Sequence, residues 1–414
     1  MSYKRNLGTT CLNGFAAILM MGRMLAYAKL LTVPEFGTLS IGLLISASLA
    51  MVNAFGLYLL MQRDLPYLFA AGRVTRGMIM MCEVTLVTVL CAVPLLGLSA
   101  TGMSLAGGAG VLLALAAVHG LTNQLFGIVS TESKSRLLQS EFSVTLFSRS
   151  CVVSVTGLLT AVKIGSAEAI LVAEILATAV MIGIVTMRAG VRYGRASLRL
   201  PVLALRHFRH SEWRAAGALF VSVILAFLMQ NSDRWLAAGA LDKPAFAEFA
   251  FAWTLLSMAS TFQVTVNANL FPSLAAQIYH QGAQAVRERT GKTSLGFLLV
   301  LGVLAVPGYL MIRWGIGAYF PQYLGVLAYI PLFLAAAAFR ASDFWANYFV
   351  ISGKTRILFA CQIAVLLGSL LVWAVTFCYP AMPPLMRLSI LTLTLAVLSF
   401  CFGFVAARVG GKMK

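Results

Sequence analysis

The chain has 414 residues and a formal net charge of +18, a balance that would suit a nucleic-acid-binding protein if the rest of the composition were that of a soluble one. Only 11% of the residues are charged and 60% are hydrophobic, whereas a soluble domain keeps roughly a quarter of its residues charged. This composition excludes a soluble enzyme, a large extramembrane domain and a disordered chain, and we expect no nucleic-acid partner.

Apolar stretches of about 20 residues recur along the whole chain, and each is long enough to cross a hydrocarbon core about 30 Å thick. Their Gly, Pro and charged boundaries predict twelve transmembrane helices. These lie at 7–31, 38–62, 78–98, 105–129, 142–162, 167–187, 215–239, 246–270, 294–314, 322–342, 357–379 and 386–408. We therefore expect an all-α polytopic membrane protein with about 12 transmembrane helices.

The charges on alternate loops agree with this assignment. If the N-terminus lies in the cytoplasm, 22 basic residues fall on inner loops and termini, and only 5 fall on the outer side or its rim. Lys and Arg collect in the same way in the cytoplasmic loops of membrane proteins. We predict a multi-pass protein with both termini cytoplasmic, and most of the net charge then reflects insertion topology.

The sequence also predicts an internal repeat. Segment 31–37 (LTVPEFG) is answered by 241–247 (LDKPAFA), 210 residues later, and 134–136 (KSR) is answered by 354–356 (KTR), 220 residues later. Both matches fall at equivalent loops of two six-helix halves. Because six is an even number, both halves enter the membrane from the same side, so the repeat is parallel and a central cavity between two bundles is expected.

The predicted domains are an N-terminal six-helix lobe at 1–187, a basic cytoplasmic linker at 188–214 and a C-terminal six-helix lobe at 215–414. The linker is rich in arginine. A linker that sets topology is favoured, and interfacial amphipathic helices that hold anionic lipid, or a docking surface for a partner, are the alternative.

Ionisable side chains at bilayer depth are costly and mark functional sites. Four arginines qualify, namely Arg23, Arg149, Arg234 and Arg340. A guanidinium stays protonated and forks onto phosphate oxygens, so Arg23, Arg149 and Arg234 are candidates to bind a pyrophosphate. Asp233 and Asn231, beside Arg234, complete the predicted substrate-binding set. Structural charge pairing remains open for all of these arginines.

The acids at comparable depth are Glu83, Glu174, Asp233 and Asp343. Arg340 and Asp343 lie three residues apart on one predicted helix, so a local pair or snorkelling is favoured there. Glu83 falls in the first turn of its predicted span, where an acid favours the helix N-terminus. Glu174 could carry a coupling proton or pair with Arg149.

One histidine lies within a predicted span. His119 and Asn123 are one turn apart, which predicts an interhelical hydrogen-bond cluster rather than an acyltransferase site or a proton relay. We predict no catalytic residue, no metal site and no bound cofactor.

The stretch from Arg23 to Gly37 resembles the first-loop signature of the Wzx-type O-antigen and exopolysaccharide flippases, which belong to the multidrug/oligosaccharidyl-lipid/polysaccharide exporter superfamily. The shared features are a basic residue, a Leu pair, a Pro-acid-aromatic turn and a Gly, here Lys29, Leu30, Leu31, Pro34, Glu35, Phe36 and Gly37. Segments 231–234 and 352–356 are similar to later landmarks of that family. The resemblance implies two lobes around a cavity that opens alternately to each side of the bacterial inner membrane.

The favoured function is therefore a secondary transporter that flips polyprenyl-pyrophosphate-linked oligosaccharide for cell-surface polysaccharide biosynthesis. Its partners would be that lipid-linked substrate and membrane lipids, with polysaccharide assembly proteins as candidates, and the oligomeric state is open. The alternative is an ion-coupled multidrug or cation exporter of the same superfamily. A membrane-embedded polymerase or ligase is less favoured, because such enzymes need a substantial outer loop and the outer loops expected here have about ten residues or fewer.

Overall fold

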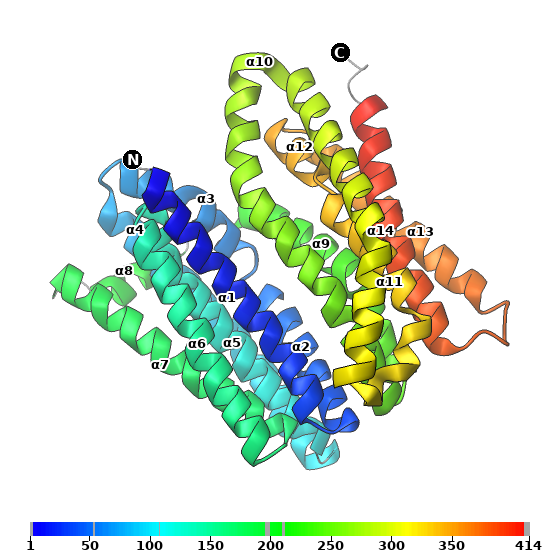
Figure 1. Ribbon diagram of the computed structural model, residues 1–414. Coiled ribbons are helices and arrows are strands. Elements are labelled where there is room, and N and C mark those ends of the chain that lie inside the picture. The colour runs from blue at the N-terminus through cyan, green and yellow to red at the C-terminus, as the bar shows by residue number, and fades with distance from the viewer. Residues whose placement is uncertain (1–2, 53, 107, 195–198, 209–211, 410–414) are drawn as a thin grey trace. The chain divides into compact units, whose positions relative to one another are not determined.

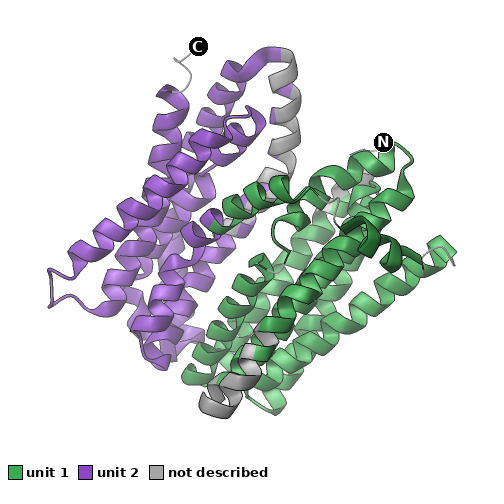
Figure 2. Cartoon of the chain, turned by 180° about the vertical axis from the view of Figure 1, so that it is seen from behind, with its two compact units in different colours: residues 1–224 green, residues 225–414 purple. Residues whose placement is uncertain are grey.

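The computed structural model describes residues 3–52, 54–106, 108–194, 199–208 and 212–409, and every element in these ranges is a helix (Figure 1). This confirms the predicted all-α class. The chain divides into two compact units, residues 1–224 and 225–414 (Figure 2). The boundary between the units falls within one helix, so it does not test the predicted bounds of the lobes and the linker, which stay a prediction.

The first unit contains the N-terminal helices. They are α1 (Tyr3–Leu30), α2 (Val33–Val52), α3 (Leu57–Ala70), α4 (Val74–Ala106), α5 (Gly108–Ser135), α6 (Gln139–Lys163), α7 (Ala167–Tyr193), α8 (Leu200–His207) and the start of α9 (Trp213–Ala240). Helix α5 packs against α2, α4 and α7, while α6 packs against α1 and α7. The polar side chains described below lie between these helices.

The second unit contains the rest of α9 and the C-terminal helices. They are α10 (Lys243–Tyr319), the 3-10 helix η3 (Pro321–Ala328), α11 (Ile330–Ser342), α12 (Trp345–Ile351), α13 (Thr355–Thr376) and α14 (Pro384–Val409). Helix α11 packs against α10 and α14, and α13 packs against α14. The run α10 contains two helices joined at Gly282, whose φ of 80° interrupts the helical backbone.

Each of the twelve predicted spans overlaps a helix. Among the described residues, ten helices are long and apolar enough to cross a bilayer, or eleven if η3 with the segment Ile330–Ile351 counts as one bent span. Large apolar side chains cover outer faces of these helices. On α10, Leu299, Val303 and Met311 are 72%, 75% and 73% exposed. An apolar surface of this kind fits hydrocarbon rather than water.

The second predicted span, 38–62, is wrong as a single helix. Helix α2 ends at Val52 and α3 begins at Leu57, because Phe55 and Gly56 have positive φ angles of 43° and 76°. A helix cannot continue through the left-handed region of backbone space. A Cβ at Gly56 would also overlap the carbonyl oxygen of Ala216, so the break packs closely against the start of α9.

Candidate functional site

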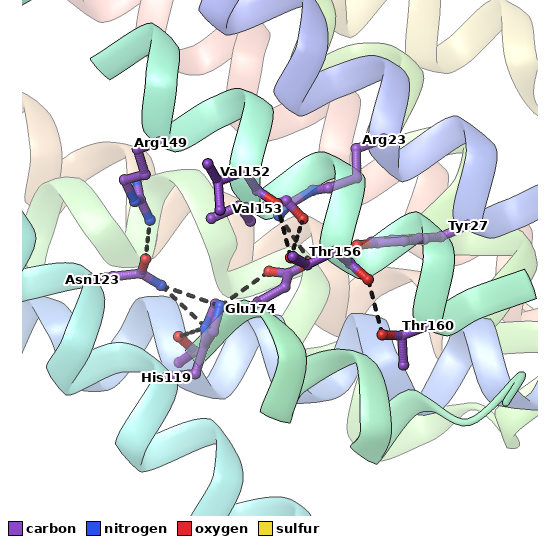
Figure 3. A network of polar contacts seen from close by, with 11 residues as sticks. Arg23, Tyr27, His119, Asn123, Arg149, Val152, Val153, Thr156, Thr160 and Glu174 are labelled. Atoms are coloured by element: carbon purple, nitrogen blue, oxygen red, sulfur yellow. Dashed lines mark hydrogen bonds and ion pairs between the residues drawn. The ribbon is translucent and has the colours of Figure 1, made fainter. Parts of the chain in front are cut away.

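The first unit holds a buried polar network that is centred on Glu174 of α7 (Figure 3). Only 1% of the Glu174 side chain is exposed. Arg23 of α1 forms an ion pair with it, with Nη1 2.8 Å from Oε1, and the Tyr27 hydroxyl donates a hydrogen bond of 2.8 Å to the same oxygen. A carboxylate removed from water needs such partners, because unpaired burial of a charge is costly.

His119 of α5 occupies the other side of the carboxylate. Its Nε2 lies 3.2 Å from Glu174 Oε2, and its Nδ1 lies 2.7 Å from the Ser46 hydroxyl of α2. The Asn123 amide nitrogen lies 3.1 Å from the same Nδ1. The predicted interhelical hydrogen-bond cluster around His119 is therefore confirmed, and it joins three helices.

Arg149 of α6 extends the network. Its Nη2 donates to the Asn123 side-chain oxygen, and its guanidinium lies 4.6 Å from the centroid of the Phe126 ring. Both contacts are with neutral groups, whereas Arg23 is neutralised by Glu174. The alternative pairing of Arg149 with Glu174 is not found. Within the part of this network that the structure describes, two guanidinium groups therefore face one carboxylate.

Glycines allow these helices to approach one another. A Cβ at Gly157 of α6 would overlap the Tyr27 hydroxyl and lie 3.4 Å from Glu174 Oε1. A Cβ at Gly120 of α5 would lie 2.6 Å from the Ser46 carbonyl oxygen of α2. Small residues at helix contacts permit close backbone approach in membrane bundles.

The second unit holds a separate network around Asp233 of α9, whose side chain is fully buried. Arg340 Nη2 of α11 lies 3.3 Å from Asp233 Oδ2, and the Thr392 hydroxyl of α14 donates a hydrogen bond of 2.8 Å to the same oxygen. Arg234 instead donates to the Asn231 side-chain oxygen at 3.3 Å, and its guanidinium lies 4.2 Å from the Trp253 ring centroid. The predicted substrate-binding residues of this half are thus close together on α9.

The predicted local pair between Arg340 and Asp343 is wrong. Helix α11 ends at Ser342, and Asp343 has φ −83° and ψ 90°, so the two residues no longer share a helical face. Asp343 Oδ2 instead accepts a hydrogen bond of 2.5 Å from the Ser399 hydroxyl, and its backbone oxygen accepts one of 2.6 Å from Gln263.

The position predicted for Glu83 is also wrong. Helix α4 begins at Val74, so Glu83 lies well inside the helix rather than in its first turn. Its Oε1 lies 3.2 Å from Nδ1 of His207 on α8, the short helix in the predicted linker. Both residues line a cavity of about 290 Å³ that also contacts Arg73 and Arg76.

The two networks join equivalent helices of the predicted repeat. In each half they connect the first, fourth and sixth predicted spans, through Arg23, His119 and Glu174 in one half and Asp233, Arg340 and Thr392 in the other. The corresponding positions are 210, 221 and 218 residues apart. The first helix supplies the base in one half and the acid in the other.

Sequence reasoning did not identify Tyr27, Ser46, Thr392 or Ser399 as members of these networks. Tyr27 follows Arg23 by one helical turn, which places both side chains on one face. The three hydroxyl residues carried no comparable signal, because Ser and Thr within a membrane helix commonly bond to their own backbone.

No protein-family model and no curated protein matches the sequence. Solved structures do match its fold. The lipid II flippase MurJ in an inward closed conformation has a TM-score of 0.68 and 12% identity, with 98% of this chain and 88% of that chain covered. An outward-facing MATE multidrug resistance transporter of the MOP superfamily has a TM-score of 0.59 and 14% identity, with 98% and 97% covered. A MOP superfamily transporter from Pyrococcus furiosus has a TM-score of 0.57 and 13% identity, with the same coverage.

These likenesses extend over nearly the whole chain. At 12–14% identity they establish the fold, which is that of the MOP superfamily transporters. The same fold serves a flippase and multidrug transporters, so the fold alone does not identify the function of this chain.

Proposed function

We propose that the chain is a secondary transporter that flips a polyprenyl-pyrophosphate-linked oligosaccharide across the bacterial inner membrane by alternating access, for cell-surface polysaccharide biosynthesis. The observation that carries the proposal is the surplus guanidinium in the first unit. Arg149 is half-buried at membrane depth, and its described contacts are a neutral amide and an aromatic ring. A cation held in this way favours an anionic ligand.

A pyrophosphate suits this arrangement for geometric reasons. A planar guanidinium can donate two parallel hydrogen bonds to phosphate oxygens, and such charge-assisted bonds are stronger than neutral ones. Arg149 Nε has no hydrogen-bond partner within the described part of the chain. Nε of Arg23 has no hydrogen-bond partner there either, but the Arg23 guanidinium is charge-paired with Glu174, whereas no described carboxylate pairs with Arg149.

The flippase neighbour adds support of a different kind. MurJ is a lipid II flippase and shares this fold over nearly the whole chain. A lipid-linked substrate is therefore compatible with the architecture. Apolar side chains on the outer faces of the helices would leave the polyprenyl tail in hydrocarbon while the polar head is carried by the protein.

Replacement of Arg149 tests the proposal. In a strain that lacks the native gene, we expect Arg149→Gln to cause accumulation of the lipid-linked oligosaccharide and to lower flipping in proteoliposomes on the order of tenfold to a hundredfold, as loss of a charged hydrogen bond predicts. Arg149→Lys keeps the charge without the fork and should retain part of the activity. Arg313→Gln, at an exposed position of α10, is the matched control.

An exporter of organic cations is the second candidate, because MATE transporters share the fold to a similar extent. Buried carboxylates such as Glu174 and Asp233 are the groups that would serve it. The same proteoliposomes distinguish the two functions. If the protein takes up tetraphenylphosphonium and no variant flips the lipid-linked sugar, the exporter would replace the flippase as the proposed function.

A further inference from the structure

The second unit contains a cavity of about 380 Å³. The pyrophosphate site proposed around Arg149 lies in the first unit and gives this cavity no role. The volume of the cavity falls within the range of small-molecule sites, roughly 300–1,000 Å³. Helices α9 to α14 contribute to its wall, and the polar lining includes the neutral side chains Asn231, Gln263, Asn347, Gln362 and Ser399. Amides and hydroxyls of this kind both donate and accept hydrogen bonds.

Three polar groups of the wall have no hydrogen-bond partner among the described residues. These are Oε1 of Gln362, whose side chain is 7% exposed, the indole Nε1 of Trp345, which is 3% exposed, and the indole Nε1 of Trp253. The amide oxygen is an acceptor and the two indole groups are donors. Buried polar groups are nearly always hydrogen-bonded, so an unpartnered acceptor and donor in one cavity point to a ligand that supplies both kinds of group.

The charged residues of the wall already have partners. Arg340 is paired with Asp233, and the carboxylate of Asp343 accepts hydrogen bonds from the Ser399 hydroxyl and the Trp345 backbone nitrogen. Arg234 contacts the wall residues Asn231 and Trp253, so two guanidinium groups and two carboxylates, Asp233 and Asp343, lie at the cavity, and neither charge is in excess. The cavity is therefore poorly suited to concentrate either a pyrophosphate or an organic cation.

We propose that this cavity binds a neutral sugar unit of the lipid-linked oligosaccharide. A sugar ring carries several hydroxyl groups, each of which donates and accepts, and its C–H face packs against an aromatic ring. Trp253 and Trp345 supply aromatic surface in the wall. This inference rests on the proposed function and extends it, because recognition of pyrophosphate and recognition of sugar are assigned to different units of the chain.

The first experiment compares two lipids on the purified full-length protein in nanodiscs. Binding of undecaprenyl pyrophosphate is measured beside binding of the same lipid bearing N-acetylglucosamine, galactose or rhamnose. We expect at least one sugar-bearing lipid to bind more tightly than the bare lipid, by roughly three- to tenfold for each hydrogen bond to the sugar.

Variants of the cavity wall test whether the gain in affinity for the sugar-bearing lipid arises in this cavity. Gln362→Met and Trp345→Phe each remove one unpartnered polar group and keep most of the side-chain volume. Both should reduce the ratio of the two affinities toward one and leave binding of the bare lipid unchanged. Gln284→Met, at an exposed position of α10, is the control and should keep the wild-type ratio. Equal affinity of the wild-type protein for bare and sugar-bearing lipids would overturn the inference while leaving the flippase proposal standing.

A second measurement distinguishes failure of the flippase proposal from failure of the sugar-site inference. If neither lipid binds, the flippase proposal fails, and quenching of tryptophan fluorescence by the free methyl glycosides of the same sugars still tests the cavity. Saturable quenching that is lost in Gln362→Met would support a sugar site. Quenching by tetraphenylphosphonium alone, or by none of these compounds, would overturn it.

Discussion

Glu174 illustrates how a carboxyl group within a candidate membrane span is surrounded by polar partners. Arg23, Tyr27 and His119 contact its two oxygens, and together they replace the hydrogen bonds that water would provide. Removal of one partner from a buried ion pair leaves the other charge without compensation. The stability of the first unit should therefore depend on this single side chain.

We expect Glu174→Gln to destabilise the protein by about 3–5 kcal/mol, the range found when a buried pair loses one member. The reason is that Arg23, which is 6% exposed, would keep its charge without a carboxylate. Thermal unfolding in detergent, followed by tryptophan fluorescence, measures the change. Glu168→Gln in the first turn of α7 is the control and should have little effect.

The double variant Glu174→Gln with Arg23→Gln sharpens this test. Because both charges are then absent, we expect it to be more stable than Glu174→Gln alone. If the single variants are each as stable as wild type, the ion pair contributes nothing and the interpretation is wrong.

At the residue scale the sequence predicted which charges are buried but not which residues they contact. Depth within an apolar span identified Arg23, Glu174, Asp233 and Arg340. Arg23 and Glu174 are 151 positions apart, and nothing in local periodicity specifies that they meet. Their pairing depends on the angle and rotation of two helices, which side-chain packing over the whole unit determines.

At the scale of the elements, the contact between α1 and α6 depends on a glycine, which has no side chain. Gly157 leaves the space that the Tyr27 hydroxyl occupies when it donates to Glu174. Ridges of larger side chains would keep the two helices farther apart. The same contact therefore serves the packing of the helices and the orientation of the network.

We expect Gly157→Ala to lower both the unfolding temperature and the transport rate, because the new methyl group overlaps the Tyr27 hydroxyl. Tyr27→Phe removes that hydroxyl, so the double variant should be more stable than Gly157→Ala alone. Thermal unfolding and the proteoliposome assay measure the two effects. Gly183→Ala on α7, where an added Cβ has no atom within 4 Å, is the control.

An additive outcome would contradict this account. If Tyr27→Phe lowers the stability of Gly157→Ala by as much as it lowers that of the wild type, the hydroxyl and the methyl group do not compete for the same space.

Hydropathy predicted where most helices lie because the membrane requires about 20 apolar residues for each crossing. It missed the break between α2 and α3, since a hydropathy window averages composition and does not register two residues with positive φ. The local pairing rule likewise treated Asp343 as sharing a helix with Arg340, although the predicted span 322–342 and α11 both end at residue 342. Glycine at position 56 was the one local signal for the first of these breaks.

At the scale of the whole molecule, the distribution of basic residues predicts the orientation in the membrane. Arg73 and Thr355, the first residue of α13, belong to the predicted inner side, whereas Cys378 follows α13 at the outer end of the predicted span 357–379. The fold alone is compatible with either orientation, so this part of the topology remains a prediction from charge.

We expect a membrane-impermeant maleimide to label Cys378 in intact spheroplasts of a variant that keeps only this cysteine, because the residue is exposed. Cysteines introduced as Arg73→Cys and Thr355→Cys, both at exposed positions, should react only after the membrane is opened. The reverse pattern would show that the positive-inside interpretation is wrong for this chain.

If the proposed transport function holds, the two ion pairs bear on its kinetics. Each ion pair lies within one unit, Arg23 with Glu174 in the first and Asp233 with Arg340 in the second. If alternating access moves the units as rigid bodies, neither ion pair has to separate on the way. The activation barrier of the empty transporter would then contain no cost for separating these buried charges, and its rate should change little with ionic strength.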